Sequence, residues 1–489
     1  AQIMGARQCF LQLAFLALLF LSAWWASAVF PRAFVGQVSG AHIVFLCGDA
    51  PSRQFAQSLA PTRTTSDVLT ATQQSTSKYP PPTTTHSSVL IMSTVRPSEV
   101  PRAEALGPIG INGTVSFEDW AKWYVSSGGM NLVTETLLAQ VLPFVELEHP
   151  VPIKPVPERN DSQPLLSDAQ CVAGSSGKFV SLRTSPVMVI DVAIFGFDLD
   201  MYEVRLHELQ DVVDLFFVVE MPWTHKGVRK PLLWARNKEK ARFRAFREKV
   251  VHIIVSTLPN GTAASKNSNA KVDWRFERWQ ETQGMSLVKE ELAARSIRPG
   301  SVVMLYGDAD EIPFASVVNM VRRCQPRGLP LDVGSWMPLG DFGQAFRTDF
   351  PVSFSNPYTF GSPVFHDPFV SYGRDFGNAG QMKGMYVLGG WHLTNYLYSP
   401  HRFVKNFVTT DYGGGLGSDE KAALRKGLEA FREVELATFA KRCQSVSKLL
   451  QKEPYRSRPE LLQPPSIMVH NRDRYEAWFG QLDRRSTTA

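Results

Sequence analysis

The sequence has few cysteines, and none lies in a pattern that binds metal. The 489 residues include five, Cys9, Cys47, Cys171, Cys324 and Cys443, with no Cys-x-x-Cys pair and no histidine at zinc-ligand spacing. A structural zinc site is therefore not expected. If the bulk of the chain lies in an oxidising compartment, the last three cysteines can supply one disulfide, and spacing does not choose which two pair.

Motifs for common phosphate-binding folds and blocks of like charge are also missing. No Gly-rich dinucleotide motif or P-loop follows a predicted strand, so NAD binding and P-loop ATP hydrolysis have no support. The 52 basic and 46 acidic residues are spread along the chain, and the net charge of +6 is poor evidence for a nucleic-acid partner. The hydrophobic fraction of 44% is enough for a sizeable core.

One long apolar run stands near the N-terminus. The 22 residues from Cys9 to Phe30 carry no charge, and a membrane-spanning helix needs about 20. We predict a transmembrane signal anchor over 9–30 behind a cytosolic tail over 1–8. A cleaved signal peptide is the alternative, because Ala26-Ser27-Ala28 fits the cleavage rule. Either interpretation sends the rest of the chain into the secretory pathway, and the first predicts a single-pass type II protein of the Golgi or ER membrane.

The composition changes after the apolar run. Residues 31–110 are predicted to form a disordered stalk, because Ser, Thr and Pro dominate much of this segment and aromatic residues are rare. The stalk is either O-glycosylated or a plain linker. A neck and connector follow over 111–185, with a short helix expected where Trp120, Trp123 and Tyr124 share one face. The last segment, 481–489, is a tail.

Residues 186–480 have the pattern of an α/β domain. Apolar runs of strand length occupy 187–195, 215–220, 250–255 and 302–306, and helical periodicity occupies 199–213 and 274–296. The strands show no polar alternation. We therefore predict an α/β domain with a mostly parallel, buried sheet.

Three carboxylates directly follow the fourth predicted strand, in Gly-Asp-Ala-Asp-Glu-Ile-Pro. Ligands of open α/β sheets bind at the carboxyl ends of strands. If the chain stays extended here, Asp308 and Asp310 point the same way and suit Mg²⁺ or Mn²⁺, which also bind phosphate. A solvated, charged turn is the alternative. A second Asp-x-Asp, at Asp198 and Asp200, starts a predicted helix, where N-capping explains it.

Four blocks in the same order resemble glycosyltransferase family 17, which contains the transferases that add the bisecting N-acetylglucosamine to N-glycans. The Asp-Ala-Asp-Glu-Ile-Pro run is one of them, and the others are an opening block, a Gly-Trp-His segment and a C-terminal block. The resemblance covers about 187–479. The remaining three blocks occupy 197–220, 389–396 and 455–479.

The resemblance implies a GT-A-like nucleotide-sugar-binding fold with a luminal catalytic domain. It implies UDP-N-acetylglucosamine as donor, Mn²⁺ or Mg²⁺ as metal, and inverting transfer to a mannose of an N-glycan. Asp308 and Asp310 carry over as metal and diphosphate ligands, with Glu311 beside them in a less defined role. Four more positions are assigned to donor binding by the same resemblance: Asp200, Arg205, His392 (also a metal ligand, after two glycines that let a backbone approach a ligand) and Lys405.

Some positions depart from the family, and some have ordinary explanations. Gly307 and the Leu-Thr-Asn after His392 differ from relatives, and 333–373 is only loosely similar, so the acceptor pocket is the least defined part. His392 is equally consistent with a core histidine beneath Trp391, and Lys405 with a solvated lysine.

Inverting transfer needs a base near the acceptor hydroxyl. Candidates beside aromatic residues or in the intervening loops are Asp341, Asp349, Asp367 and Asp375. Asp341 is preferred, because its flanking glycines indicate an exposed loop, and Asp375 is the second choice. Each is also explained as a surface or capping residue.

Two other function classes stay open. A secreted carbohydrate-binding protein would use the aromatic residues without turnover, and the Asp-x-Asp at a strand end argues against it. A glycoside hydrolase would use two carboxylates across one bond and needs no diphosphate site.

Overall fold

The described residues all fall within the unit Glu99–Ala489. The computed structural model describes residues 116–126, 134–147, 151–154, 171, 177–263, 273–339, 341–346, 358–359, 363–370, 385–394, 418–439, 443–453 and 455–479. The predicted anchor, stalk and C-terminal tail lie outside these ranges. Within them, no helix is both long and apolar enough to cross a bilayer.

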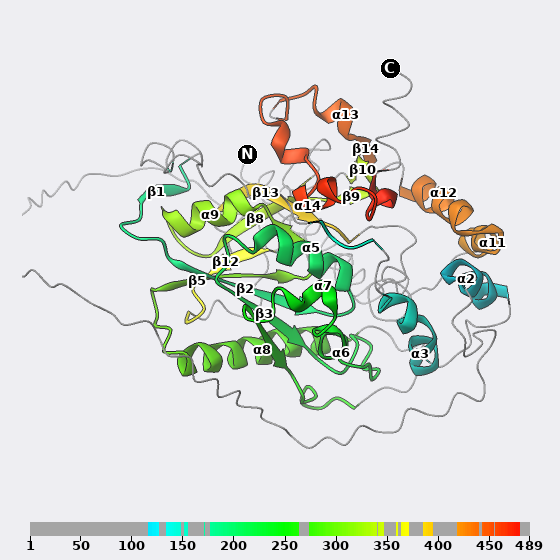
Figure 1. Cartoon of the computed structure of the whole chain (residues 1–489), viewed down its shortest axis with the longest axis horizontal. Coiled ribbons are helices and arrows are strands. Elements are labelled where there is room, and N and C mark those ends of the chain that lie inside the picture. The colour runs from blue at the N-terminus through cyan, green and yellow to red at the C-terminus, as the bar shows by residue number, and fades with distance from the viewer. Residues whose placement is uncertain are drawn as a thin grey trace, which may run out of the picture. The chain divides into compact units, whose positions relative to one another are not determined.

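A large sheet forms the centre of this unit (Figure 1). The four strands β4, β3, β2 and β5 at one end of the sheet are parallel. At the other end β12 (Val364–His366) runs antiparallel to β5 (Val302–Asp308) and to β8 (Leu331–Trp336). Strand β13 (Tyr386–His392) runs parallel to β8, and β6 (Glu311–Pro313) runs antiparallel to β13. The predicted α/β class is confirmed, with all-parallel pairing in one half of the sheet and mixed pairing in the other. The strands in spatial order are β4 (Val250–Ile254), β3 (Leu215–Glu220), β2 (Met188–Phe195), β5 (Val302–Asp308), β12 (Val364–His366), β8 (Leu331–Trp336), β13 (Tyr386–His392) and β6 (Glu311–Pro313), with β11 (Tyr358–Thr359) pairing β8.

The four predicted strands of the parallel half are confirmed to within two residues. The two predicted helices are also present, as α5 (Leu199–Leu209) and α8 (Trp274–Ala294). Helix α5 ends earlier than its periodicity indicates, because the chain turns after Leu209 to enter β3 at Leu215. The short helix expected in the neck is α2 (Phe117–Ser126), with Trp120 and Tyr124 buried.

Alternate residues of β2 face opposite layers of helices. Val189, Ala193 and Phe195 belong to the core that contains α5 and α9 (Ala315–Arg323), whereas Ile190 and its alternates belong to the core that contains α8. Figure 1 shows α8 on one side of the parallel strands and α5 and α9 on the other. A side chain at Gly284 of α8 would put a Cβ 2.4 Å from Val219 Cγ1, so the glycine lets α8 lie close on β3.

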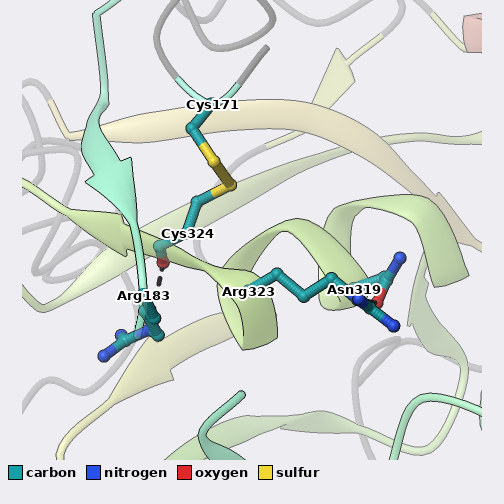
Figure 2. Close-up of a disulfide and its surroundings, with 5 residues drawn as sticks. All are labelled: Cys171, Arg183, Asn319, Arg323 and Cys324. Atoms are coloured by element: carbon teal, nitrogen blue, oxygen red, sulfur yellow. Dashed lines mark hydrogen bonds between the residues drawn. A yellow bond between two sulfur atoms is a disulfide. The ribbon is translucent and has the colours of Figure 1, made fainter. Parts of the chain in front are cut away.

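A disulfide joins the connector to the domain. It links Cys171 to Cys324, and Cys443 lies outside this bond. Cys324 begins β7 (Cys324–Pro326), which pairs with β1 (Phe179–Leu182). Figure 2 shows the bond beside Arg183, whose Nε donates a hydrogen bond of 3.2 Å to the Cys324 carbonyl.

The C-terminal block is bound to helix α5. Glu208 accepts hydrogen bonds from Ser466 Oγ at 2.9 Å and Ile467 N at 2.7 Å, at the start of α14 (Ser466–His470). Arg474 donates to Glu203 Oε2 at 2.6 Å. The other elements are α3 (Thr134–Val145), α6 (Leu233–Asn237), α7 (Ala241–Arg244), β9 (Pro338–Leu339), β10 (Asp341–Phe346), α11 (Ser418–Lys426), α12 (Leu428–Phe439), β14 (Cys443–Ser445), α13 (Val446–Leu449), η5 (Pro459–Leu462) and η6 (Glu476–Trp478).

Candidate active site

The predicted metal motif forms a tight turn at the carboxyl end of the parallel strands. Strand β5 ends at Asp308, the chain turns at Ala309 and Asp310, and β6 starts at Glu311. The expectation of an extended chain is therefore wrong, and the two aspartates do not share one environment. Asp308 is exposed, whereas Asp310 is 1% and Glu311 7% exposed.

Strand β13 brings the predicted histidine to the same turn. His392 pairs with Glu311 across the two strands, and His392 Nε2 lies 3.9 Å from Glu311 Oε1. Leu393 N donates to the Asp310 carbonyl at 2.8 Å. The structure thus gathers Asp308, Asp310, Glu311 and His392, although no group of three His, Cys, Asp or Glu side chains among the described residues is arranged to hold a metal by itself.

The two glycines before Trp391 serve packing within the protein. A Cβ at Gly389, whose φ is 143°, would lie 2.7 Å from Val317 Cγ2, and one at Gly390 would lie 2.5 Å from Ser335 Oγ. We expected these glycines to let the backbone approach a ligand. In the structure they instead allow β13 to pack closely against α9 and β8. Trp391 is 5% exposed and donates through Nε1 to the Gln463 carbonyl at 2.7 Å.

Arg205 lies beneath the turn. Its guanidinium is completely buried and donates to both carboxylate oxygens of Asp191, which is also completely buried, at 2.8 and 2.7 Å. Its Nη1 donates to the carbonyls of Asp308 and Glu311 at 2.7 and 2.6 Å. Burial acts to lower the pKa of Arg205, but the Asp191 carboxylate outweighs it and the pKa is raised. Arg205 therefore contacts the motif from inside the protein.

Asp200 lies at the start of α5 and is occupied by an ion pair. Its carboxylate contacts Arg242, which also contacts buried Glu203, and the Asp200 side chain is 35% exposed. Asp198 is the N-cap residue of α5, but its side chain makes no capping hydrogen bond, so the capping explanation is wrong. The second Asp-x-Asp therefore supports an ion-pair cluster that holds α5, α7 and the C-terminal block together.

The candidate bases fall into different places. Asp341 begins β10 and is 1% exposed, so the predicted exposed loop is wrong. Its carboxylate accepts a hydrogen bond from Gly343 N at 2.7 Å and lies 3.5 Å from Arg432 Nη2, which favours a structural role. Asp367 accepts from Phe369 N in a turn after β12. Asp349, Asp375 and Lys405 lie outside the described residues.

Topology separates Asp367 from the metal motif. Strand β12 runs antiparallel to β5 and pairs His366 with Met304, so Asp367 continues toward the amino end of β5. At about 3.4 Å per residue, it lies roughly 17 Å along the strand from Asp308. Asp367 therefore lies near the opposite edge of the sheet.

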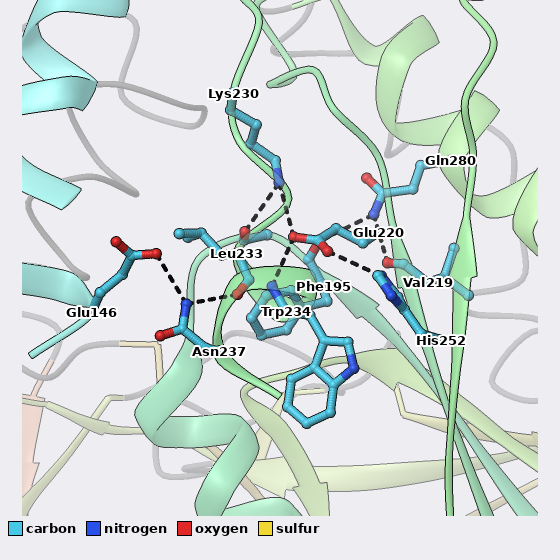
Figure 3. A network of polar contacts seen from close by, with 11 residues as sticks. Glu146, Phe195, Val219, Glu220, Lys230, Leu233, Trp234, Asn237, His252 and Gln280 are labelled. Atoms are coloured by element: carbon cyan, nitrogen blue, oxygen red, sulfur yellow. Dashed lines mark hydrogen bonds and ion pairs between the residues drawn. The ribbon is translucent and has the colours of Figure 1, made fainter. Parts of the chain in front are cut away.

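A second polar network borders the site at the end of β3. Glu220 accepts from Trp234 N at 3.1 Å, lies 3.6 Å from Lys230 Nζ, and contacts His252 Nε2 at 3.1 Å (Figure 3). Lys230 also donates to the Gly196 carbonyl at 3.3 Å, after β2. Burial lowers the pKa of Lys230, and Glu220 opposes that shift. The network fixes the loop between β3 and α6 at the same sheet edge as Asp308.

Sequence reasoning missed Asp191. It is the one charged residue in the apolar run of the first predicted strand, and a carboxylate in a buried strand requires a partner. That signal was available before the structure, although nothing local identifies Arg205 as the partner.

Comparison with known proteins agrees with the motif-level resemblance. Residues 166–343 match the model of glycosyltransferase family 17. The proteins named beta-1,4-mannosyl-glycoprotein 4-beta-N-acetylglucosaminyltransferase from Rattus norvegicus, Homo sapiens and Mus musculus are each 30% identical over 140 residues, which is 29% of this chain and 24% of each relative. This chain therefore aligns with less than a third of those relatives' length.

The matched segment contains the turn and the elements beneath it, whereas β13 with His392 lies outside it. The segment includes β2 with Asp191, helix α5 with Arg205, and the turn with Asp308 and Asp310. The Gly-Trp-His and C-terminal blocks lie beyond it, so their resemblance stays a prediction. Over residues 166–343, the resemblance of this chain to glycosyltransferase family 17 is confirmed.

Proposed function

We propose that this chain transfers N-acetylglucosamine from UDP-N-acetylglucosamine to a mannose of an N-glycan, with inversion at the transferred sugar. The proposal is supported chiefly by the Asp-Ala-Asp-Glu turn at the carboxyl end of β5, inside the segment that matches the family. Ligands of α/β sheets bind at this edge. The names of the similar proteins give N-acetylglucosamine as the transferred sugar and a mannosyl-glycoprotein as the acceptor.

Asp308 and Asp310 are the residues that we propose to hold a divalent metal. Carboxylate oxygens are the hard ligands that Mg²⁺ and Mn²⁺ prefer, and such ions are usually held by one or two carboxylates together with substrate phosphates. Exposed Asp308 and neighbouring Asp310 would hold the ion, with His392 beside them. When bound, the metal supplies charge neutralisation to the departing diphosphate.

The protein's own residues orient the donor and accept a proton. The acceptor hydroxyl oxygen attacks C1 of the sugar, the bond from C1 to the phosphate oxygen breaks, and UDP leaves with the electron pair. A carboxylate takes the hydroxyl proton. Asp375 is our choice for that base, because Asp341 is buried against Arg432.

The compartment belongs to the same proposal. A donor of this kind and an N-glycan acceptor meet in the lumen of the secretory pathway, so we propose a Golgi or ER membrane protein with a luminal catalytic domain. Protease protection of the domain in intact microsomes tests this placement, and digestion without detergent would contradict it.

The deciding experiment compares two site variants with a matched control. The full chain is incubated with UDP-sugars and mannose-terminated N-glycans, with Mn²⁺ or with EDTA. Asp308→Asn and Asp310→Asn are expected to lower kcat/KM by about a hundredfold or more, since metal stabilisation of leaving-group charge contributes several kcal/mol. Asp211→Asn, an exposed residue after α5, is expected to behave as wild type.

Other outcomes identify the competing functions. Glycan binding that ignores both UDP-sugar and Mn²⁺ would indicate a carbohydrate-binding protein. Glycan cleavage that persists in EDTA would indicate a glycoside hydrolase. Full activity of both aspartate variants would show that the turn has no role in the reaction. The stereochemistry is tested by NMR of the product, in which an α linkage would show that transfer proceeds with retention and not with inversion.

A further inference from the structure

We propose that Arg205 is a positioning residue of the candidate site, which fixes the backbone of the turn that carries Asp308 and Asp310. Its effect on donor binding rests on the proposed function, whereas its hold on the turn is a property of the protein without ligand. Arg205 touches neither a substrate nor a metal in this proposal and acts through the main chain.

Strand alternation explains how the arginine finds its partner. Val189, Ala193 and Phe195 of β2 face the core that contains α5, and Asp191 belongs to the same alternate series. Helix α5 crosses that face and buries Arg205 against Asp191. The ion pair is therefore built into the sheet beside Leu305 of β5, three residues before that strand ends at Asp308.

The geometry of the guanidinium carries orientation from the sheet to the turn. Two of its nitrogens bind the two oxygens of Asp191, which fixes the plane of the group. In that plane, the third nitrogen donates to the carbonyls of Asp308 and Glu311 at 2.7 and 2.6 Å. Because these residues flank the turn, one side chain fixes both of its ends.

The turn needs such a support because the sheet pairing changes there. Strand β5 pairs with β2 and β12, whereas β6 pairs with β13 at the other end of the sheet. The Glu311 carbonyl at the crossing is buried and the Asp308 carbonyl is partly buried, and a buried carbonyl without a donor is costly. Arg205 supplies two donors at the point where the strand ladder is interrupted.

Stability alone does not account for this arrangement. A buried ion pair is often no more stabilising than apolar side chains of similar volume. What apolar side chains cannot supply is a fixed set of donors, and catalytic groups must be held within about 0.5 Å of their working positions. The ion pair therefore serves the geometry of the turn.

The test compares Arg205→Lys with a matched buried arginine, Arg474→Lys. Arg474 binds one carboxylate and one carbonyl, Glu203 at 2.6 Å and Val151 at 2.7 Å, whereas Arg205 binds one carboxylate and two carbonyls. These contacts of Arg474 do not involve the turn. A lysine has no planar fork and cannot bind Asp191 with two nitrogens while reaching the turn. Hydrogen–deuterium exchange of the full chain is measured without ligand. The backbone amides of residues 309–311 are expected to exchange about tenfold faster in Arg205→Lys and at the wild-type rate in Arg474→Lys. A tenfold change corresponds to the loss of one hydrogen bond from a charged donor.

Donor binding is measured separately by calorimetry with UDP and Mn²⁺. Arg205→Lys is expected to weaken affinity about tenfold, and Arg474→Lys to leave it unchanged, even if both variants melt at lower temperature. Should Arg205→Lys fail to fold, Asp191→Asn removes the charge that orients the guanidinium, and the same local acceleration is expected.

The results separate this inference from the proposed function. Unchanged exchange of the turn in Arg205→Lys, or equal acceleration in Arg474→Lys, would overturn the positioning role. Faster exchange with unchanged UDP affinity would overturn its effect on donor binding. A wild-type chain that binds no UDP would refute the proposed function, while the exchange data would still decide whether Arg205 holds the turn.

Discussion

Lowering the pH should destabilise this protein through a histidine buried in the sheet. His366 ends β12, its side chain is completely buried, and its ring lies edge-on to that of Tyr306 with 6.5 Å between centroids. Burial lowers the pKa of His366 to about 3, from an ordinary value of 6.5. Between pH 6.5 and about 3, the His366 ring is therefore protonated in the unfolded chain and neutral in the folded chain.

The sign and size of the effect follow from linkage. Because the folded pKa is depressed, stability is complete above pH 6.5 and falls as the pH drops toward 3. One histidine contributes a slope of at most about 1.4 kcal/mol per pH unit, or about 2 kcal/mol between pH 6.5 and 4.5 because the slope is half its maximum at pH 6.5. His207, whose pKa burial and the cations Arg474 and Arg242 lower to about 4, adds a slope of the same sign.

Urea titrations of the full chain at half-unit intervals from pH 7.5 to 4.5 test this reasoning. His366→Gln should flatten the dependence of the unfolding free energy on pH by about 1.4 kcal/mol per unit relative to wild type. His470→Gln, at an exposed position on α14, serves as the control for the substitution of a histidine by glutamine outside the sheet. Parallel curves for wild type and His366→Gln would refute the assignment of the acid loss to this residue.

Two further predictions concern packing and the cross-link. Gly284→Ala should lower the unfolding free energy by about 1–3 kcal/mol, because its Cβ overpacks α8 against β3, and adding Val219→Ala should restore part of that loss. An unchanged unfolding free energy in Gly284→Ala would mean that the helix shifts freely to make room. Reduction of the bond between Cys171 and Cys324, which are 153 residues apart, should lower stability by up to about 5 kcal/mol, measured by urea titration with and without dithiothreitol; identical curves for fully reduced and oxidised protein would contradict it.

Local pattern was sufficient for the parallel half of the fold. Strands such as β3, at Leu215–Glu220, are continuous apolar runs because both faces of the sheet are covered by helices. Helix α8 was equally readable, and its Gly284, which argues against a helix locally, is explained only by the contact with Val219. The mixed half was not predicted, because its short strands, such as β12 and β6, have too few residues to show a pattern of apolar and polar positions.

The candidate site was predictable in composition and not in arrangement. The carboxylates after β5 and His392 were identified from motifs, whereas their meeting depends on the pairing of β13 with β6. Asp341 was misplaced in an exposed loop, because flanking glycines say nothing about the cover that Arg432 provides. The roles of Asp341 and Asp375 as bases stay predictions.

The sequence by itself determined the α/β class, the resemblance to glycosyltransferase family 17 and the residues of the Asp-Ala-Asp-Glu turn, because periodicity and motifs are properties of neighbouring residues. Only the tertiary structure decided that the aspartates differ in exposure and that Arg205 holds the turn from below. Burial and hydrogen bonding join residues that are distant in the chain, and no local pattern records which distant partner a buried charge will meet.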